Sequence, residues 1–372
     1  MGYPSAPLRA GQRMHDMMPV AEHDEMSRQL FLQSFLQDIG ERREPGNETV
    51  WAKSVQPRFR KEHGREPKNV AEMRKAMLQE PYIQVWSSLK RIAKELQYES
   101  AGPMVERQLP ELIDKAEHYR TSNRKLGSLT LDPSIKAPRY NSEIEIHVQP
   151  GGYHVEVTEQ DDVFAGALWD RVYTLGEPDR GEWGDLPGIA TSNWIKEQFP
   201  DLKPTKILDV GCTIGQSTLP YCDAFPDAEI HAIDVGAPVL RYGHARAEAL
   251  GKKVHFSQQD GEKTRFKDGS FDLIFSHLLF HETSRTGVEN IFREGYRLLK
   301  PGGVMFLDDI PDRNRMEQTT SFFFDWMTHN AAEPFINGWI DTDRQAVAER
   351  VGFDRKKAKQ GGPQNRYFAF RK

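Results

Sequence analysis

The stretch Lys206-Ile-Leu-Asp-Val-Gly-Cys-Thr-Ile-Gly215 decides the fold class of this chain. An apolar run typical of a buried strand leads to Asp209, a loop bounded by Gly211 and Gly215 follows, and a helical pattern starts near Gln216. Glycine at these positions lets the backbone turn tightly and leaves room for a helix or a ligand close to the loop. In open α/β sheets the ligand lies beyond the carboxyl ends of the strands, which is where this loop stands. We therefore expect a ligand-binding loop here.

Strand and helix patterns alternate from about residue 161 to the end, which is typical of a parallel sheet with helices on both faces. Near the end, two apolar runs flank a Gly/Pro turn, so we expect the sheet to close with an antiparallel strand. The expected strands are Lys206–Val210, Glu229–Asp234, Val254–Gln258, Phe271–Ser276, Gly303–Asp308, Phe353–Lys359 and Arg366–Arg371.

Acidic residues stand at the ends of the second and third of these strands. Asp234 follows Asp209 by about 25 residues, the place where an acid accepts hydrogen bonds from two ribose hydroxyls. Asp260, in Gln259-Asp-Gly-Glu262, is placed to accept the exocyclic amine of an adenine. The order of these pieces predicts a cofactor that contains adenosine.

These motifs resemble the class I S-adenosylmethionine-dependent methyltransferases over about residues 205–310, and by layout over 161–372. The resemblance implies an α/β fold with a Rossmann-like, mostly parallel seven-stranded sheet, a terminal antiparallel strand and S-adenosyl-L-methionine as cofactor. The family usually has glycine where Thr213 stands, and a β-branched residue there demands a negative φ or strain. The cofactor-binding residues that it implies are Asp209, Gly211, Thr213, Gly215, Asp234, Val235, Asp260, Gly261, Ser276 and His277.

A nicotinamide dinucleotide is the rival cofactor. Its fingerprint is G-x-G-x-x-G after a strand, and the loop Gly-Cys-Thr-Ile-Gly215 lacks that spacing. A pyrophosphate needs close approach of the backbone, whereas a methionine-derived cofactor carries no pyrophosphate. The loop therefore favours S-adenosylmethionine.

The predicted activity is methyl transfer by in-line displacement to a small aromatic or apolar metabolite. A general base is needed only if the acceptor must lose a proton, and the catalytic candidates after the fourth strand are His281, His277 and Glu282. A histidine that packs against the core or the cofactor is the alternative role for His281. Asp308 and Asp309 end the fifth strand and either cap it, polarise a substrate or hold a metal, and we expect no metal.

Six aromatic side chains gather in residues 321–339, and aromatic walls suit a flat apolar molecule. Core packing or a dimer contact is the alternative role of this segment. The predicted substrate-binding residues are Phe323, Trp326 and His329 from this segment, and Trp169 and Tyr173 from the segment before the first strand.

The chain is expected to fall into four parts. Residues 1–25 are a flexible arm, 26–125 an all-helical domain that serves as a lid or in dimerisation, 126–160 a β-hairpin linker, and 161–372 the methyltransferase domain. Gly40 and the Pro45-Gly46 pair are expected to stop the first helix, Pro81 to split the region 69–98, and Pro103 to begin another helix ending near Arg120. The hairpin rests on apolar residues that alternate on both sides of Pro150-Gly-Gly152.

Composition narrows the function classes. The 50 basic and 55 acidic residues give a net charge of −5, which argues against a chain built to coat nucleic acid or an anionic membrane. Two cysteines, Cys212 and Cys222, are too few for a disulfide scaffold or a cysteine-built zinc site. Without an apolar run of about 18 residues or a secretory signal, we expect a cytoplasmic protein with no membrane contact.

The expected partners are a small-molecule substrate and a second copy of the chain, bound through the helical region, with no nucleic acid. Two alternatives stay open. The chain acts on a macromolecule, RNA or protein, through the basic stretch from Ala52 to Lys75, or it is a cofactor-binding module without transfer activity.

Overall fold

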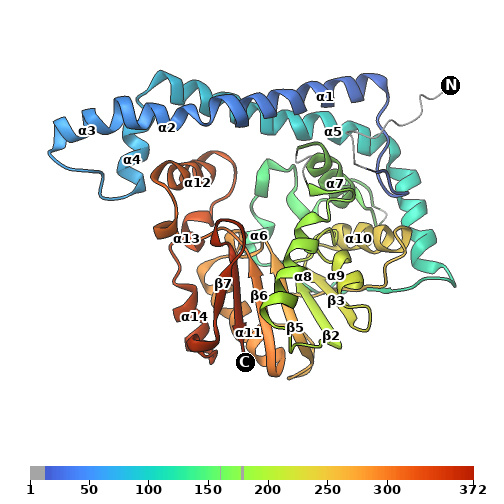
Figure 1. The fold of residues 1–372 in the computed structure, drawn as a ribbon. Helices are drawn as coiled ribbons and strands as arrows, with labels where there is room; N and C mark the ends of the chain where they lie inside the picture. The colour runs from blue at the N-terminus through green and yellow to red at the C-terminus, as the bar shows by residue number, and fades with distance from the viewer. Residues whose placement is uncertain (1–12, 160, 177–179) are drawn as a thin grey trace.

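The computed structural model describes residues 13–159, 161–176 and 180–372. Figure 1 shows an α/β part with a sheet at its centre and, across its top, a layer of long helices from the N-terminal third of the chain. A cavity lies between these two parts.

The sheet has the strand order β1-β4-β3-β2-β5-β6-β8-β7. Neighbouring strands are parallel from β1 to β6, and β8 runs antiparallel to both β6 and β7, which confirms the α/β, Rossmann-like fold class with its terminal antiparallel strand. The strands are β1 (Ser128–Thr130), β2 (Lys206–Val210), β3 (Glu229–Asp234), β4 (His255–Gln258), β5 (Phe271–His277), β6 (Leu299–Asp308), β7 (Lys359–Gly361) and β8 (Tyr367–Arg371).

The described sheet holds eight strands, one more than the resemblance implied. The short edge strand β1 accounts for the difference, since it pairs with β4 from a segment expected to be a linker. The carboxylate of Glu248 accepts the backbone N–H groups of Leu126 and Gly127 and so directs the chain along β4.

Alternate residues of the central strands pack into two cores, one on each face of the sheet. Leu208 and Leu307 face the core under α11 and α14, whereas Ile207 and Phe306 face the core under α8 and α9. Because both faces are buried, these strands read in the sequence as continuous apolar runs. The helices of this part are α7 (Phe164–Gly176), α8 (Leu186–Gln198), α9 (Leu219–Ala224), α10 (Ala237–Ala249), α11 (Arg285–Leu298), α12 (Gln318–Asn330), α13 (Ile336–Ile340) and α14 (Arg344–Val351).

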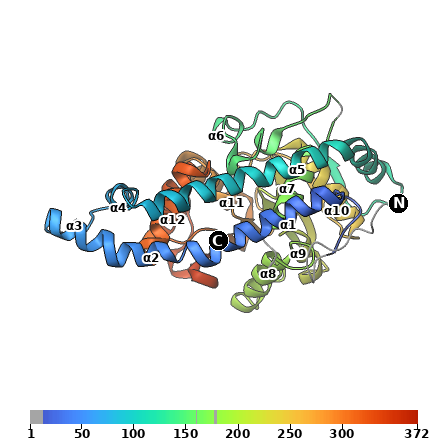
Figure 2. The ribbon, with the colours of Figure 1, turned by 90° about the horizontal axis from the view of Figure 1, so that it is seen from above.

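The N-terminal layer consists of two long helical runs lying side by side (Figure 2). The first run passes through α-helical and π-helical turns, and the second is the 41-residue helix α5. The elements of the N-terminal layer are α1 (His23–Asp38), the π-helices η1 (Ile39–Arg43) and η2 (Trp51–Val55) with α2 (Gly46–Val50) between them, α3 (Gln56–His63), α4 (Val70–Met77) and α5 (Pro81–Thr121).

The expected helix stops in this layer are partly wrong. Gly40 and Pro45 do not end the first run, because the π-helical turn shifts the hydrogen-bond register and Pro45 falls where no N–H donor is needed. Pro81 does separate two helices, as expected, and stands in the first turn of α5. The helix expected to begin at Pro103 is instead the second half of α5, which contains both Pro103 and Pro110.

The β-hairpin expected within residues 126–160 is also wrong. The chain there forms a short helix and two 3₁₀ turns, with no strand pairing between 144 and 157. His147 and Val148 have φ of 60° and 66°, which is incompatible with an extended strand, and the apolar alternation arises because Ile146 and Tyr153 are buried from turns. The short helical elements of the chain are α6 (Arg139–Ser142), η3 (Ile146–Val148), η4 (Gly152–His154), η6 (Phe280–Glu282), η7 (Arg313–Arg315), η8 (Arg355–Lys357) and η9 (Pro363–Asn365).

A flexible arm is expected over residues 1–25, and part of its described stretch packs against the rest of the chain. Residues 1–12 lie outside the described residues, but Met17 is fully buried and His15 Nε2 lies 2.8 Å from Asp170 Oδ2 on α7. This segment is therefore pinned against the α/β part.

The helical layer shares its apolar cores with the α/β part. Around Leu109, the second half of α5 packs on α7 and α10, and near its start the ring of Trp86 lies 5.0 Å from that of Trp326 on α12. Within the residues that the structure describes, no helix combines the length and apolarity needed to cross a membrane.

Candidate active site

A cavity of about 520 Å³ lies at the carboxyl ends of β2, β3, β4 and β5, beneath α5 and α12. One part of its wall is the loop after β2 together with strand-end residues. The other part is aromatic and charged and comes largely from the helical layer, the 139–173 segment and α12. The residues from α5 are Lys90, Lys94, Gln97 and Tyr98, and those from α12 are Phe323, Phe324, Trp326 and Met327.

The loop after β2 has the backbone shape that its glycines predicted. Gly211 and Gly215 both have φ of 76°, and a Cβ on Gly211 would lie 2.7 Å from the Leu279 side chain. Thr213 has φ of 48°, so the strain expected of a β-branched residue at this position is present. Its N–H donates to Asp234 Oδ2 at 3.0 Å, which ties the loop to the end of β3.

The acids at the strand ends line the cavity, with Asp209 buried and Asp234 partly buried. Asp234 also accepts the Gly236 N–H, and burial raises its pKa. Asp209 accepts the Thr218 hydroxyl at 2.6 Å through Oδ2, whereas its buried Oδ1 has no hydrogen-bond partner. Burial raises the pKa of Asp209 to about 7. These features fit a cofactor with polar ribose and amino groups. They are the unpartnered oxygen of Asp209, the two glycines with positive φ, and the carboxylate of Asp234 at the end of β3.

Most of the predicted cofactor residues line this cavity. Gly215 and Ser276 do not, because Gly215 lies against the Phe256 ring and Ser276 is buried within β5. Those that line it are Asp209, Gly211, Thr213, Asp234, Val235, Asp260, Gly261 and His277.

Four of the five predicted substrate residues also line the cavity: Trp169, Tyr173, Phe323 and Trp326. The exception is His329, whose side chain is 48% exposed and lies 3.8 Å from Asp325 instead. His329 is on α12, but on a side of the helix that does not face the cavity. The prediction that it binds the substrate is therefore wrong.

Two histidines at the end of β5 and in the turn after it each lie against an aspartate at or just after the end of β6. His277 Nδ1 is 2.8 Å from Asp308, and His281 Nδ1 is 2.9 Å from Asp309. Burial alone lowers the pKa of His281, but Asp309, Glu282 and Glu333 outweigh it and raise that pKa to about 9. His281 is therefore an imidazolium at neutral pH.

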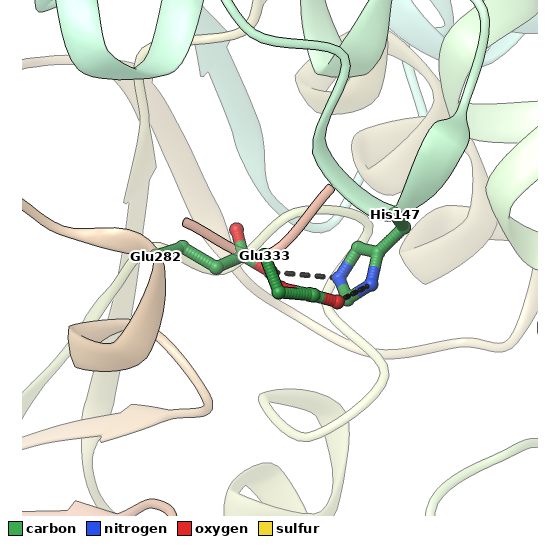
Figure 3. A group of neighbouring side chains, drawn as sticks. All are labelled: His147, Glu282 and Glu333. Atoms are coloured by element: carbon green, nitrogen blue, oxygen red, sulfur yellow. Dashed lines mark hydrogen bonds and ion pairs between the residues drawn. The ribbon is translucent and has the colours of Figure 1, made fainter. Parts of the chain in front are cut away.

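A further cluster joins His147 of η3, Glu282 of η6 and Glu333 of the α12–α13 link (Figure 3). His147 Nε2 lies 2.7 Å from Glu282 Oε1, and Nδ1 lies 2.5 Å from Glu333 Oε1. Lys94 of α5 lies 3.5 Å from both Glu333 and His147. Tyr153 donates its hydroxyl to Glu282 at 3.1 Å.

One nitrogen and two carboxylates within 4.8 Å are a ligand set that a transition metal accepts. Each imidazole nitrogen of His147, however, already faces a carboxylate, and Lys94 supplies a further positive charge. The chain thus neutralises this donor set by itself.

Aromatic rings stand beside the cluster. Trp169 lies 3.9 Å from Tyr173, 5.0 Å from Tyr153 and 5.3 Å from His147, measured between ring centroids. The cavity wall here is both apolar and charged.

Sequence reasoning missed His147, Glu333 and Lys94. His147 stands in the predicted hairpin, Glu333 in the aromatic segment and Lys94 on the face of a predicted helix. The three are far apart in the sequence, so no motif of fixed spacing connects them. The run Ile-His-Val148 before Pro150-Gly-Gly152 was the available signal, because binding and catalytic residues are disproportionately found on loops.

Residues 207–303 match the family model described as a methyltransferase domain. This part of the chain is a methyltransferase domain, and its resemblance to the S-adenosylmethionine-dependent class is confirmed. The rest of the chain lies outside that match.

Among relatives, the chain is 33% identical over 143 residues to phosphoethanolamine N-methyltransferase 3 of Arabidopsis thaliana, covering 38% of this chain and 27% of that protein. It is 32% identical over 216 residues to phosphoethanolamine N-methyltransferase 2 of Caenorhabditis elegans, covering 54% and 49%. It is 32% identical over 108 residues to demethylmenaquinone methyltransferase of Thermus thermophilus, covering 29% and 48%. The chain thus spans about a quarter to a half of the length of these relatives.

Among solved structures, an S-adenosylmethionine-dependent methyltransferase from Aquifex aeolicus aligns with a TM-score of 0.37 at 20% identity, covering 53% of this chain and 94% of that chain.

Proposed function

We propose that the chain is an S-adenosylmethionine-dependent methyltransferase that acts on a small molecule held in the cavity. The observation that carries this proposal is that one cavity contains both the glycine loop with its acids and an aromatic chamber beneath α5 and α12. The cofactor and a methyl acceptor would therefore meet in one space.

The residues present fit the cofactor. Asp234 would accept hydrogen bonds from the ribose hydroxyls, and Asp260 would accept one from the adenine amine. The Oδ1 atom of Asp209, which has no partner among the described residues, would accept a hydrogen bond from a further polar group of the ligand. When bound, S-adenosylmethionine supplies an electrophilic methyl group, and the chain's task is to hold the acceptor in line and exclude water.

A small acceptor is favoured over a macromolecule because the helical layer roofs the cavity. In the basic stretch Arg58–Lys75, which would have served RNA or protein, four of the seven basic side chains form ion pairs within the chain. The pairs are Arg58 with Glu80, Arg60 with Glu66, Arg65 with Glu72 and Arg74 with Asp325.

The aromatic walls favour an acceptor with a flat or apolar body. Residues 26–125 are proposed to act as the roof of the active site. The cytoplasmic location, the homodimer through this region and the absence of a nucleic-acid partner stay predictions.

Two measurements test the proposed function. Calorimetry on the full chain should show binding of S-adenosylmethionine or S-adenosylhomocysteine and none of NAD. A screen of small aromatic and amine-bearing metabolites with methyl-labelled cofactor should then give a labelled product. Binding of NAD without binding of either methionine-derived ligand would refute the cofactor assignment, and label found only on added RNA or protein would refute the small acceptor.

A further inference from the structure

A line of four charged side chains runs from the cavity wall into the roof, with alternating sign: Glu282, His147, Glu333 and Lys94. We propose that the acceptor is an O–H or N–H group whose proton goes to Glu282, and that His147, Glu333 and Lys94 are positioning residues that hold Glu282 at the cavity. This inference rests on the proposed function and adds to it the chemical class of the acceptor atom.

Glu282 has the geometry of a held proton acceptor. Its side chain is 12% exposed and lines the cavity, and its Oε1 receives both His147 Nε2 at 2.7 Å and the Tyr153 hydroxyl at 3.1 Å. Two contacts on one oxygen fix the direction of the carboxylate, as a group that must meet one hydrogen of a bound acceptor requires.

His147 is held in turn from behind. Glu333 has a fully buried side chain, and its Oε1 lies 2.5 Å from His147 Nδ1 (Figure 3). A ring with a carboxylate at each nitrogen cannot rotate without losing one of the two contacts. His147 also has a left-handed backbone, a conformation that persists only where the surroundings fix it.

Lys94 completes the charge balance. Its ammonium group lies 3.5 Å from Glu333. Without Lys94, the two carboxylates of Glu333 and Glu282 would have only the one positive charge of His147 between them. An unbalanced buried charge is strongly unfavourable, so the roof helix α5 is part of what keeps Glu282 in place.

His277 and His281 are less well placed to accept the proton. The carboxylates beside His281 raise its pKa to about 9 against the effect of burial, which favours a ring that is already protonated at neutral pH. The Nε2 atom of His277 is buried and so is not exposed to an acceptor in the cavity. Glu282 is the carboxylate in this group that is both ion-paired and open to the cavity.

The proton and electron balance is simple. The bond from the acceptor oxygen or nitrogen to the methyl carbon forms, the carbon–sulfur bond breaks with its electron pair going to sulfur, and the acceptor's proton passes to Glu282. A carbon or sulfur acceptor without such a proton would gain nothing from Glu282.

The first test compares Glu282→Gln with Glu289→Gln, a control on α11 whose side chain is half-buried and lies outside the cavity wall. With an O–H or N–H acceptor found in the metabolite screen, Glu282→Gln should lower turnover by about 10²–10⁴-fold while the affinity for S-adenosylhomocysteine stays within about twofold. Full turnover of Glu282→Gln would overturn the proposal, and so would a carbon or thioether acceptor. If the wild-type chain transfers no methyl group at all, the proposed function fails instead.

The second test needs no turnover. In ¹⁵N-histidine NMR spectra of the full chain, both nitrogens of His147 should be protonated at pH 7.5, because each of them faces a carboxylate oxygen, 2.7 Å away on Glu282 and 2.5 Å away on Glu333. Glu333→Gln should return His147 to a neutral ring at that pH and leave the signals of His15, which is buried against Asp170, in place, which shows that the variant is folded. Unchanged His147 signals in a folded Glu333→Gln chain would overturn the positioning role.

Discussion

At the scale of single residues, the loop after β2 carries the main departure from a glycine-rich cofactor loop. Thr213 adopts φ of 48° although its side chain is branched at Cβ, and its N–H still reaches Asp234. A non-glycine residue in this region stores about 1–3 kcal/mol of strain. The strain is therefore separable from the hydrogen bond, which the backbone alone provides.

Thr213→Gly should raise the free energy of unfolding by about 1 kcal/mol, since relief of strain exceeds the ~0.5–1 kcal/mol of backbone entropy that glycine loses. Urea unfolding measures the change. Thr213→Ala is the matched control, because it keeps Cβ and should gain less. A Thr213→Gly chain less stable than Thr213→Ala would show that the position is not strained.

Asp234→Ala should weaken S-adenosylhomocysteine binding by about 1.5–3 kcal/mol, the value of a hydrogen bond to a charged group. Calorimetry measures it, with Asp227→Ala, an exposed aspartate just before β3, as the control. Equal affinity in the two variants would remove Asp234 from the ribose site.

His281 should make stability depend on pH. Its pKa of about 9 in the folded chain lies above the value of 6.5 for a free histidine, so its contribution is fully present below pH 6.5 and is lost as the pH rises through 9. The difference in unfolding free energy between the wild type and His281→Gln should fall by on the order of 3 kcal/mol from pH 6 to pH 10. A difference that stays constant across this range would mean that His281 is neutral in the folded chain.

The acids at the strand ends could be predicted from the sequence, whereas the residues of the His147 cluster could not. Asp209, Asp234 and Asp260 follow strands, and strand ends meet at one edge of a parallel sheet, so their meeting could be predicted. His147 and Glu333 come from a turn and a helix link, and only the packing of the helical layer brings them together. No local pattern encodes such a contact.

At the scale of elements, the apolar runs predicted β2 and β3 to the residue, because buried parallel strands have no solvent side to break the run. The helix stops were harder to place. A π-helical turn let Pro45 be accommodated, and α5 passes through two prolines, since packing on both sides outweighs the helix-breaking tendency of single residues.

The contact between α5 and α12 should carry much of the roof's stability. Trp86 is buried against Trp326, so Trp86→Ala should lower the free energy of unfolding by about 3–5 kcal/mol. The neighbouring Val85 is 54% exposed, and Val85→Ala should change stability by no more than about 0.5 kcal/mol. Thermal or urea unfolding of both variants provides the comparison, and similar losses would mean that the roof is loosely packed.

At the scale of the whole molecule, the helical layer and the α/β part share one core and are not two independent units. Leu109 of α5 packs in the same cluster as Phe164 of α7 and Tyr242 of α10. A chain that began near residue 160 would expose this cluster, so we expect the layer to be needed for folding as well as for the roof.

Leu109→Ala should lower the free energy of unfolding of the entire chain by about 2–5 kcal/mol. Tryptophan fluorescence and S-adenosylhomocysteine binding should be lost at the same urea concentration in this variant. Leu30→Ala, at an exposed position of α1, is the control. Two separate transitions would show that the layer unfolds alone.

The roof of the cavity comes from opposite ends of the chain, and this has a consequence for synthesis on the ribosome. Trp86 and its apolar neighbours on α4 and α5 are made early, whereas Phe322 and Trp326, which cover them, are made when most of the chain has already emerged. The apolar underside of the roof therefore stays uncovered while strands β1 to β6 are translated. Such a surface is where a nascent chain is open to chaperones and to aggregation.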